Sequence, residues 1–188
     1  MSWHAIFVQT GKEDTVCSRM TRLLEQVNYK AEYELLVPKR KLQERHQGQY
    51  VEVVTKMFPG YVLVKSNEIK ELYSRTLRCR YIIRFLKDDK GFEEIKLEEI
   101  ANIINMIDSD GVIGVSDVFV ENDIVKVTSG SMIEYSGWVK KIDKHKKRAK
   151  VLFKFGGLNH LIDLPINIIR KPSDDEIKNE LMFFTSRL

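Results

Sequence analysis

The chain has 188 residues, of which 43% are apolar and 31% are charged, and its formal net charge is +4. This length suits one medium or two small domains, and the apolar fraction is typical of a packed protein. The two cysteines are far apart and form no CxxC motif, which excludes a disulfide framework or a zinc finger and fits a reducing cytoplasm. The four histidines show no metal-ligand spacing, and no apolar run approaches the ~20 residues that span a membrane.

The positive charge is concentrated in the C-terminal third of the chain. Residues 1–120 hold 18 basic and 18 acidic side chains, whereas residues 121–171 hold 11 basic and 5 acidic ones. Residues 172–188 carry a small acidic excess. A basic module beside a neutral one favours a polyanionic partner for the basic module.

Strand-like and helical patterns alternate along the first 110 residues. Strands are predicted over residues 3–9, 32–38, 50–54, 61–64 and 81–86, and helices after residue 12 and over 68–76 and 97–107. Thr10 and Glu13 have the spacing of a capping box at the first helix. The order predicts an α+β domain over residues 1–110, a split βαβ unit whose antiparallel sheet carries its helices on one face.

The run Lys56–Val64 places a Phe-Pro-Gly-Tyr turn between two strand-like segments. Pro59 presets φ and Gly60 can adopt a positive φ, so two strands can meet there at a tight angle. Phe58 and Tyr61 flank this turn and would present flat apolar surface to a partner. Alternatively, both rings close the core of the domain, since aromatic side chains pack well in either setting.

Residues 39–49 are polar, positively charged and rich in glutamine, with a glycine near their end. This composition predicts the tip of a long exposed hairpin. Lys39, Arg40 and Lys41 make it a second candidate site for a polyanion, after the basic C-terminal module.

A second module is predicted after residues 111–119, which lose periodicity and are interpreted as a linker between independently folding domains. Short strands are expected over residues 123–128, 137–142, 149–155 and 159–164, which favours a small β-barrel over residues 120–171. Residues 172–188 open with Ser173 and Glu176 in capping-box spacing and continue with helical apolar periodicity. This tail is therefore predicted to be a C-terminal amphipathic helix.

Two sets of residues resemble the NusG family of transcription elongation factors. Residues 3–8, the run Phe58–Val64 and residues 81–86 are similar to the N-terminal (NGN) domain of that family. The segment Asp123–Gly130, followed by Tyr135–Val139, is similar to its C-terminal KOW module, an SH3-like β-barrel. The resemblance covers about residues 2–171 in the family's order and leaves the tail uncovered.

The resemblance implies an NGN domain that docks on the clamp helices of RNA polymerase through an apolar patch. Such binding would bridge the two sides of the nucleic-acid cleft and disfavour pausing, without a cofactor or a metal. The sequence shows no nucleophile–base pairing, P-loop or phosphate-cradling glycine run, which favours a protein that is not an enzyme. The positions that match the polymerase-binding patch are Phe7, Phe58, Pro59, Tyr61 and Leu63.

Within the family, residues 10–14, 38–41 and 140–150 most resemble LoaP, a specialised antiterminator paralog. In LoaP-like proteins the KOW module binds an RNA hairpin in the nascent transcript, which implies processive antitermination of a particular operon. The alternative for the basic segment 140–150 is that it binds no RNA and is a solvated turn, whose charge keeps the protein soluble. The candidate RNA-binding residues are Lys140, Lys141, Lys144, His145, Lys146, Lys147, Arg148 and Lys150.

In the general NusG factor, apolar loop residues of the KOW module dock on a ribosomal protein or on Rho. Met132, Ile133, Tyr135 and Phe155 keep part of that surface, whereas Lys154 replaces a usually apolar neighbour of Phe155. Two alternatives stay open: a housekeeping NusG-type elongation factor without RNA sequence preference, and a KOW-containing ribosomal protein. We expect a cytoplasmic monomer that does not associate with membranes.

Overall fold

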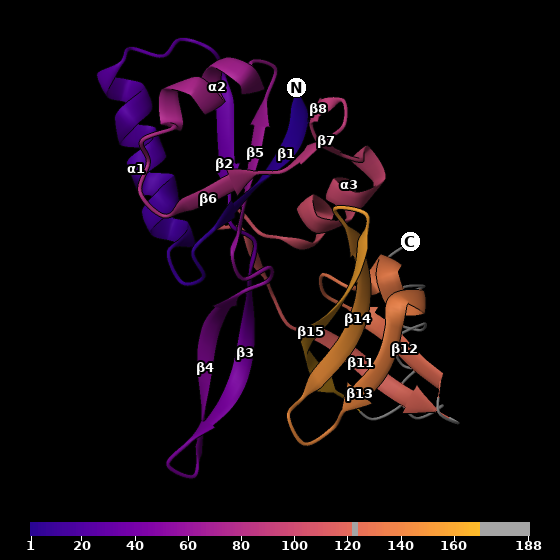
Figure 1. The fold of residues 1–188 in the computed structure, drawn as a ribbon. Coiled ribbons are helices and arrows are strands. Elements are labelled where there is room, and N and C mark those ends of the chain that lie inside the picture. The colour runs from indigo at the N-terminus through magenta and orange to yellow at the C-terminus, as the bar shows by residue number, and fades with distance from the viewer. Residues whose placement is uncertain (122–123, 170–188) are drawn as a thin grey trace, which may run out of the picture.

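The N-terminal domain is built on an antiparallel sheet in the computed structural model, which describes residues 1–121 and 124–169 (Figure 1). The strands follow the order β2-β5-β1-β6, and β9 also pairs with β1. The two strongest apolar runs of the domain form its central pair, in which Phe7 lies opposite Tyr61. The strands are β1 (Ser2–Val8), β2 (Tyr33–Leu36), β5 (Tyr61–Ser66), β6 (Ile82–Phe85) and β9 (Glu94–Ile95).

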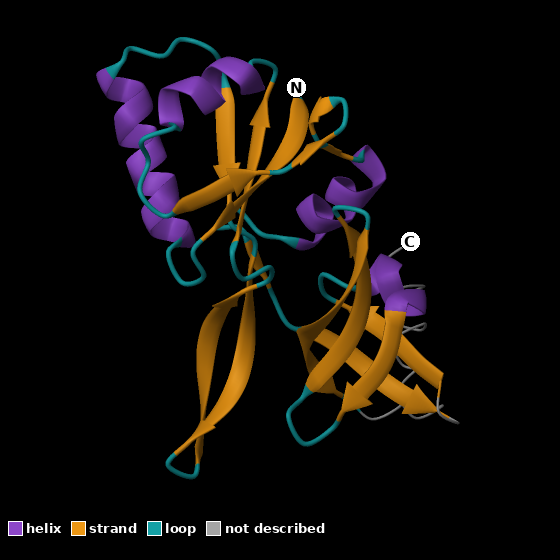
Figure 2. Cartoon of the chain, viewed as in Figure 1, coloured by secondary structure: helices purple, strands orange, loops and turns teal. Residues whose placement is uncertain are grey.

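Helices lie on both faces of this sheet, so the prediction that they share one face is wrong (Figure 2). Side chains alternate along β1, which sends Ile6 and Val8 to one face and Trp3 and Ala5 to the other. The first face packs with α1 and α2, whereas Ile103 of α3 packs on the second. The helices are α1 (Glu13–Gln26), α2 (Ile69–Thr76) and α3 (Leu97–Met106).

A long hairpin of β3 (Lys39–His46) and β4 (Gln49–Lys56) projects away from the sheet (Figure 1). Its two-residue turn is formed by Gln47 and Gly48, whose φ values of 48° and 86° are those that a type I′ turn requires. The predicted hairpin is confirmed, although the basic segment forms strand β3 rather than the tip. Two shorter pieces complete the domain: β10 (Val112–Ile113), parallel to β3, and the ribbon of β7 (Lys87–Asp88) and β8 (Gly91–Phe92).

The C-terminal domain is a curled sheet with the strand order β12-β11-β15-β14-β13. A 3-10 segment, η1 (Ile133–Trp138), lies between β12 and β13 in the chain. No pairing joins those two edge strands within the described residues, so the predicted small β-barrel is a curled half-barrel. Its strands are β11 (Ser116–Glu121), β12 (Ile124–Ser129), β13 (Val139–Asp143), β14 (Arg148–Phe155) and β15 (Leu158–Ile168).

Residues 111–119, interpreted from the sequence as a linker, contain β10 and the first part of β11. Here β11 pairs in parallel with β15, with Ser116 opposite Ile166. The domain boundaries at residues 110 and 120 stay a prediction, and the helix predicted over residues 172–188 lies outside the described residues. None of the helices in the described ranges is long and apolar enough to cross a membrane.

The two domains contact each other through apolar side chains. Leu63 of the N-terminal sheet, Ile103 of α3 and Phe155 of the C-terminal domain belong to one continuous group of buried residues. At the tip of the β14–β15 hairpin, the backbone N–H of Gly156 donates to a carboxylate oxygen of Glu99 on α3, at 3.2 Å. The structure therefore places the C-terminal domain against the α3 face of the N-terminal sheet (Figure 1).

Candidate binding surfaces

The five residues predicted to bind the polymerase lie at one end of the central strand pair. Phe7 and Tyr61 are cross-strand neighbours with ring centroids 5.4 Å apart, and Phe58 and Pro59 form the turn that leads into β5. Pro59 is exposed, but Leu63 has no exposed surface. Leu63 therefore belongs to the core below the patch, and the rings of Phe7, Phe58 and Tyr61 form the aromatic patch itself.

A buried carboxylate holds the turn of this aromatic patch. Gly60 has a φ of +85°, and a side chain there would meet Thr10 Oγ1 at 3.2 Å and the Phe7 ring at 3.3 Å. The Glu13 carboxylate, which has no exposed surface, accepts hydrogen bonds from the backbone N–H groups of Gly60 at 2.7 Å and Gly11 at 3.1 Å. The predicted capping box is wrong, because Lys12 is the N-cap of α1 and no side chain caps it. Glu13 instead ties the helix start to the turn.

Replacing Glu13 by alanine should destabilise the domain, because two backbone donors would lose a charged acceptor in the interior. Hydrogen bonds to charged groups contribute about 1.5–3 kcal/mol each, so we expect the free energy of unfolding to fall by about 3 kcal/mol. Urea denaturation of the full chain measures this change. Glu25→Ala, on the exposed face of the same helix, is the control and should leave the midpoint unchanged. Equal midpoints for the two variants would show that Glu13 does not hold the turn.

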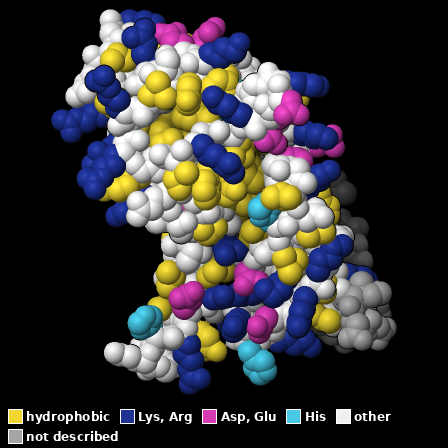
Figure 3. Space-filling view, viewed as in Figure 1, with side chains coloured by type: hydrophobic (Ala, Val, Ile, Leu, Met, Phe, Trp, Pro, Cys, Tyr) yellow, Lys and Arg dark blue, Asp and Glu magenta, His cyan; other side chains and the backbone are white. Residues whose placement is uncertain are grey.

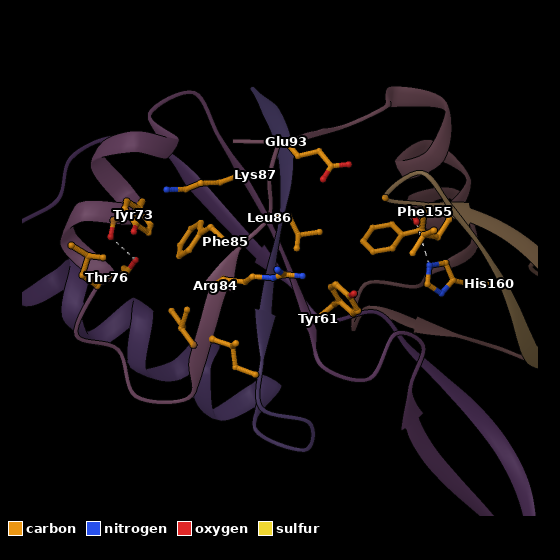
Figure 4. Close-up of a pocket in the computed structure, with 15 residues that line it drawn as sticks. Tyr61, Tyr73, Thr76, Arg84, Phe85, Leu86, Lys87, Glu93, Phe155 and His160 are labelled. Atoms are coloured by element: carbon orange, nitrogen blue, oxygen red, sulfur yellow. Dashed lines mark hydrogen bonds between the residues drawn. The ribbon is translucent and has the colours of Figure 1, made fainter. Parts of the chain in front are cut away.

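The tip of the β14–β15 hairpin lies over the aromatic patch (Figure 4). Phe155 stacks on Phe58, with centroids 4.6 Å apart and planes 23° apart, and meets Tyr61 edge-on at 5.8 Å. His160 packs edge-on against Phe58 at 5.6 Å, and its ring is hydrogen-bonded to the carbonyl oxygen of Phe155. The C-terminal domain thus covers Phe58 and part of Tyr61 in this arrangement.

A groove of about 550 Å³ continues from the covered rings along strand β6 (Figure 4). β6 is an edge strand, and its residue Ile83 is 57% exposed. Arg84 places its guanidinium over the Phe7 ring, at 5.9 Å from the centroid. Figure 3 shows a continuous apolar area over this domain. Sequence reasoning used residues 81–86 as a strand and for the family resemblance but named no binding residue there. The signal is a patch rather than one side chain, since Leu77, Ile83 and Leu158 are all exposed around the groove.

The basic residues predicted to bind RNA divide into two groups. Lys140, Lys141, Lys144, His145, Lys146 and Lys147 are exposed on β13 and on the turn that follows it, whereas Arg148 and Lys150 are half-buried. Asp143 closes the turn by accepting the backbone N–H of Lys146 at 2.9 Å, and this hydrogen bond lowers the pKa of the Asp143 carboxyl. The turn therefore presents several cations together on the surface.

Arg148 is held by the hairpin of the other domain. Its guanidinium donates to the carbonyl oxygen of Gln43 at 3.1 Å and lies 3.5 Å from the Glu44 carboxylate and 3.8 Å from that of Asp163. Lys150 pairs with Asp163 at 2.7 Å, and the Asp163 carbonyl accepts a hydrogen bond from Arg40 at 2.7 Å. Arg148 and Lys150 are thus engaged in contacts around Asp163 rather than presented to solvent.

Burial also affects Arg40, the hairpin residue in this group of ions. Removal from water lowers the pKa of its guanidinium, an effect that nearby Asp163 opposes and nearby Arg148 reinforces. Two arginines from different domains are therefore held together at the edge of the interface by Asp163 between them.

The apolar KOW residues expected to contact a ribosomal protein or Rho are mostly buried. Met132, Tyr135 and Phe155 are at most 8% exposed, whereas Ile133 is 52% exposed. Phe155 stacks on Phe58 in the aromatic patch of the N-terminal domain, so it is not free to contact another protein in this arrangement. Within residues 1–121 and 124–169, no group of three histidine, cysteine or acidic side chains could hold a metal ion.

Comparisons with known proteins identify the family. The family described as "Transcription termination factor nusG" matches residues 1–104. The "Transcription termination/antitermination protein NusG" of Rickettsia conorii is 26% identical over 171 residues, covering 90% of this chain and 89% of the relative. The protein of the same description from Helicobacter pylori is 21% identical over 166 residues, covering 87% and 94%. A solved structure, "Domain interaction in Thermotoga maritima NusG", shares the fold, with a TM-score of 0.57, 22% identity and coverage of 87% of this chain and 93% of that one. The chain therefore belongs to the NusG family and is a transcription factor rather than an enzyme.

Proposed function

We propose that this protein is a NusG-type elongation factor that binds RNA polymerase through the aromatic patch of Phe7, Phe58 and Tyr61. The observation that carries the proposal is the clustering of these rings at one end of the sheet, where Phe155 contacts both Phe58 and Tyr61, beside a groove lined by apolar, aromatic and charged side chains. Relatives are described as termination and antitermination proteins, which fits a factor that alters pausing and termination. The match over residues 1–104 counts against a ribosomal protein.

The domain contact has a direct consequence for this proposed function. Phe155 and His160 occupy the surface that the polymerase would need. The tip of the β14–β15 hairpin and the polymerase therefore compete for Phe58 and Tyr61. Binding of the polymerase then requires the tip of the β14–β15 hairpin to leave. The apparent affinity for the polymerase is reduced by the fraction of molecules in which the hairpin stays in place.

Replacing Tyr61 by alanine should weaken binding to purified core RNA polymerase. A central aromatic anchor contributes on the order of 2 kcal/mol to an interface, so we expect roughly a thirtyfold loss of affinity. Tyr33→Ala, at the far edge of the sheet, is the control. Circular dichroism separates two outcomes: a native spectrum with lost binding supports the interface, whereas a molten spectrum means that Tyr61 serves the core and that the proposal fails at this residue.

A second function is favoured by the exposed basic turn after β13. Five exposed lysines and His145 on one strand and turn suit the phosphates of a nascent RNA hairpin, as in a LoaP-like antiterminator that recognises one operon. The relatives found are general NusG proteins, which fits equally a factor that binds without sequence preference. Affinities for a hairpin from the leader transcript of the neighbouring operon and for a scrambled hairpin distinguish the two. Equal affinities support the general factor.

A further inference from the structure

The hairpin of the N-terminal domain and the basic turn of the C-terminal domain meet at the edge of the molecule. Arg148 at the end of the turn donates to the carbonyl oxygen of Gln43 in β3, and the Tyr50 hydroxyl of β4 reaches the carbonyl oxygen of His145 at 3.4 Å. Two basic segments about 100 residues apart in sequence are thereby brought together. Figure 3 shows Lys and Arg side chains gathered in this lower part of the molecule.

Tyr50 lies where the hairpin meets the basic turn and is itself largely exposed, at 57%. On its own hairpin it is paired with Arg45, and exposed His46 follows at the turn. Its hydroxyl group reaches the carbonyl oxygen of His145, in the turn that also carries Lys146 and Lys147. An exposed aromatic ring where two segments that carry cations meet is an arrangement that suits an unpaired base and its neighbouring phosphates.

We propose that, in the arrangement in which the two domains contact each other, Tyr50 stacks on an unpaired nucleotide of the bound RNA, on a composite surface formed by the tip of the β3–β4 hairpin and the turn after β13. The inference rests on the proposed RNA-binding function and extends it to the other domain. Lysines of the turn and Arg45 contact phosphates, which gives affinity without sequence choice. The ring adds a preference for RNA with an unpaired loop over a continuous duplex.

The structural alternative is that Tyr50 joins the two domains through its hydroxyl group. Tyr50→Phe removes the hydrogen bond to His145 and keeps the ring, whereas Tyr50→Ala removes both. The variants therefore separate stacking from a linking role. Because Tyr50 is exposed at the end of a projecting hairpin, neither substitution disturbs the core.

The test is fluorescence anisotropy with the full-length chain and two labelled RNAs, a stem-loop from the leader transcript and a blunt duplex of the same stem. Loss of one stacked base weakens binding by about tenfold or more, so Tyr50→Ala should lose that much affinity for the stem-loop and none for the duplex. Tyr50→Phe should bind both RNAs like the wild type. Equal losses of stem-loop affinity in Tyr50→Phe and Tyr50→Ala, or no loss in Tyr50→Ala, would overturn the stacking role.

The contribution of the hairpin cation is tested through the dependence of affinity on salt. Arg45→Glu should reduce the log-log slope for the stem-loop by about 0.7 to 0.9 if it removes one phosphate contact. Lys70→Glu makes the same charge change at an exposed site on α2, far from the hairpin, and should leave the slope unchanged. Identical slopes for the two variants would remove the N-terminal hairpin from the RNA surface.

The outcomes also separate this inference from the proposed function on which it rests. If the wild-type chain binds neither RNA, the RNA-binding function itself fails. If the wild type binds the stem-loop and only the lysines of the turn matter, RNA binding stands and the composite surface is overturned.

Discussion

Replacing Phe155 by alanine should increase the affinity of the full chain for RNA polymerase by about tenfold or more. The Phe155 ring stacks on Phe58 and meets Tyr61, and these contacts hold the β14–β15 hairpin over the aromatic patch. Aromatic pairs contribute about 0.5–1.5 kcal/mol each beyond the area that they bury. Removing them shifts the population toward molecules with a free patch, and the apparent affinity rises with that fraction.

Two further variants show whether the gain in polymerase affinity comes from release of the β14–β15 hairpin from the aromatic patch. Glu99→Ala removes the acceptor for Gly156 on α3 and should also raise the affinity, from a site that does not touch the patch rings. Leu161→Ala alters an exposed apolar side chain on the same hairpin and should change nothing. Thermal denaturation of each variant shows whether the C-terminal domain stays folded. An unchanged affinity in folded Phe155→Ala and Glu99→Ala would mean that the domain contact does not limit binding.

Charge reversal of the turn lysines should have the second large effect. Replacing Lys144, Lys146 and Lys147 by glutamate removes three exposed cations and should weaken binding to every RNA. Each lost phosphate contact lowers the log-log salt slope by about 0.7 to 0.9, so three contacts would lower it by roughly 2 to 3. Filter binding of the full chain across a range of salt concentrations measures both quantities.

The matched control reverses three exposed lysines of the N-terminal domain, Lys30, Lys70 and Lys90, and so makes the same change in net charge. This control should retain most of the affinity and the slope, because its charges lie away from the basic turn. If both triple variants lose affinity equally, the effect is one of net charge, and the turn after β13 is not an RNA site.

Sequence periodicity predicted the elements of the N-terminal domain well because its strands and helices have local patterns. The apolar run of β5 and the amphipathic stripe of α3 lie within two residues of the predicted bounds. Strand β11 was missed, since Asp117 and the preceding glycines in residues 111–116 look like a linker. The side of the sheet on which α3 packs was predicted wrongly, because a helical stripe does not specify which face of a sheet it covers.

The sequence predicted those features of the binding surfaces that depend on neighbouring residues in one segment. It did not predict contacts between distant segments. The proximity of Phe58 and Tyr61, which both contact Phe155, followed from the turn between them, and exposure of Lys144 and Lys146 followed from their place in a basic turn. The engagement of Arg148 by the β3–β4 hairpin, and of Phe155 by Phe58, joins residues about 100 positions apart. No local pattern specifies such a pairing of surfaces.

The central claim, that the polymerase binds the patch that Phe155 covers, is tested most directly by combining two substitutions. The affinity of core RNA polymerase is measured by biolayer interferometry for full-length Phe155→Ala and for Phe155→Ala/Tyr61→Ala. With the patch uncovered in both chains, we predict that loss of the Tyr61 anchor lowers the affinity by about thirtyfold. Equal affinities of the two chains, with native circular dichroism spectra, would place the polymerase on another surface and contradict the claim.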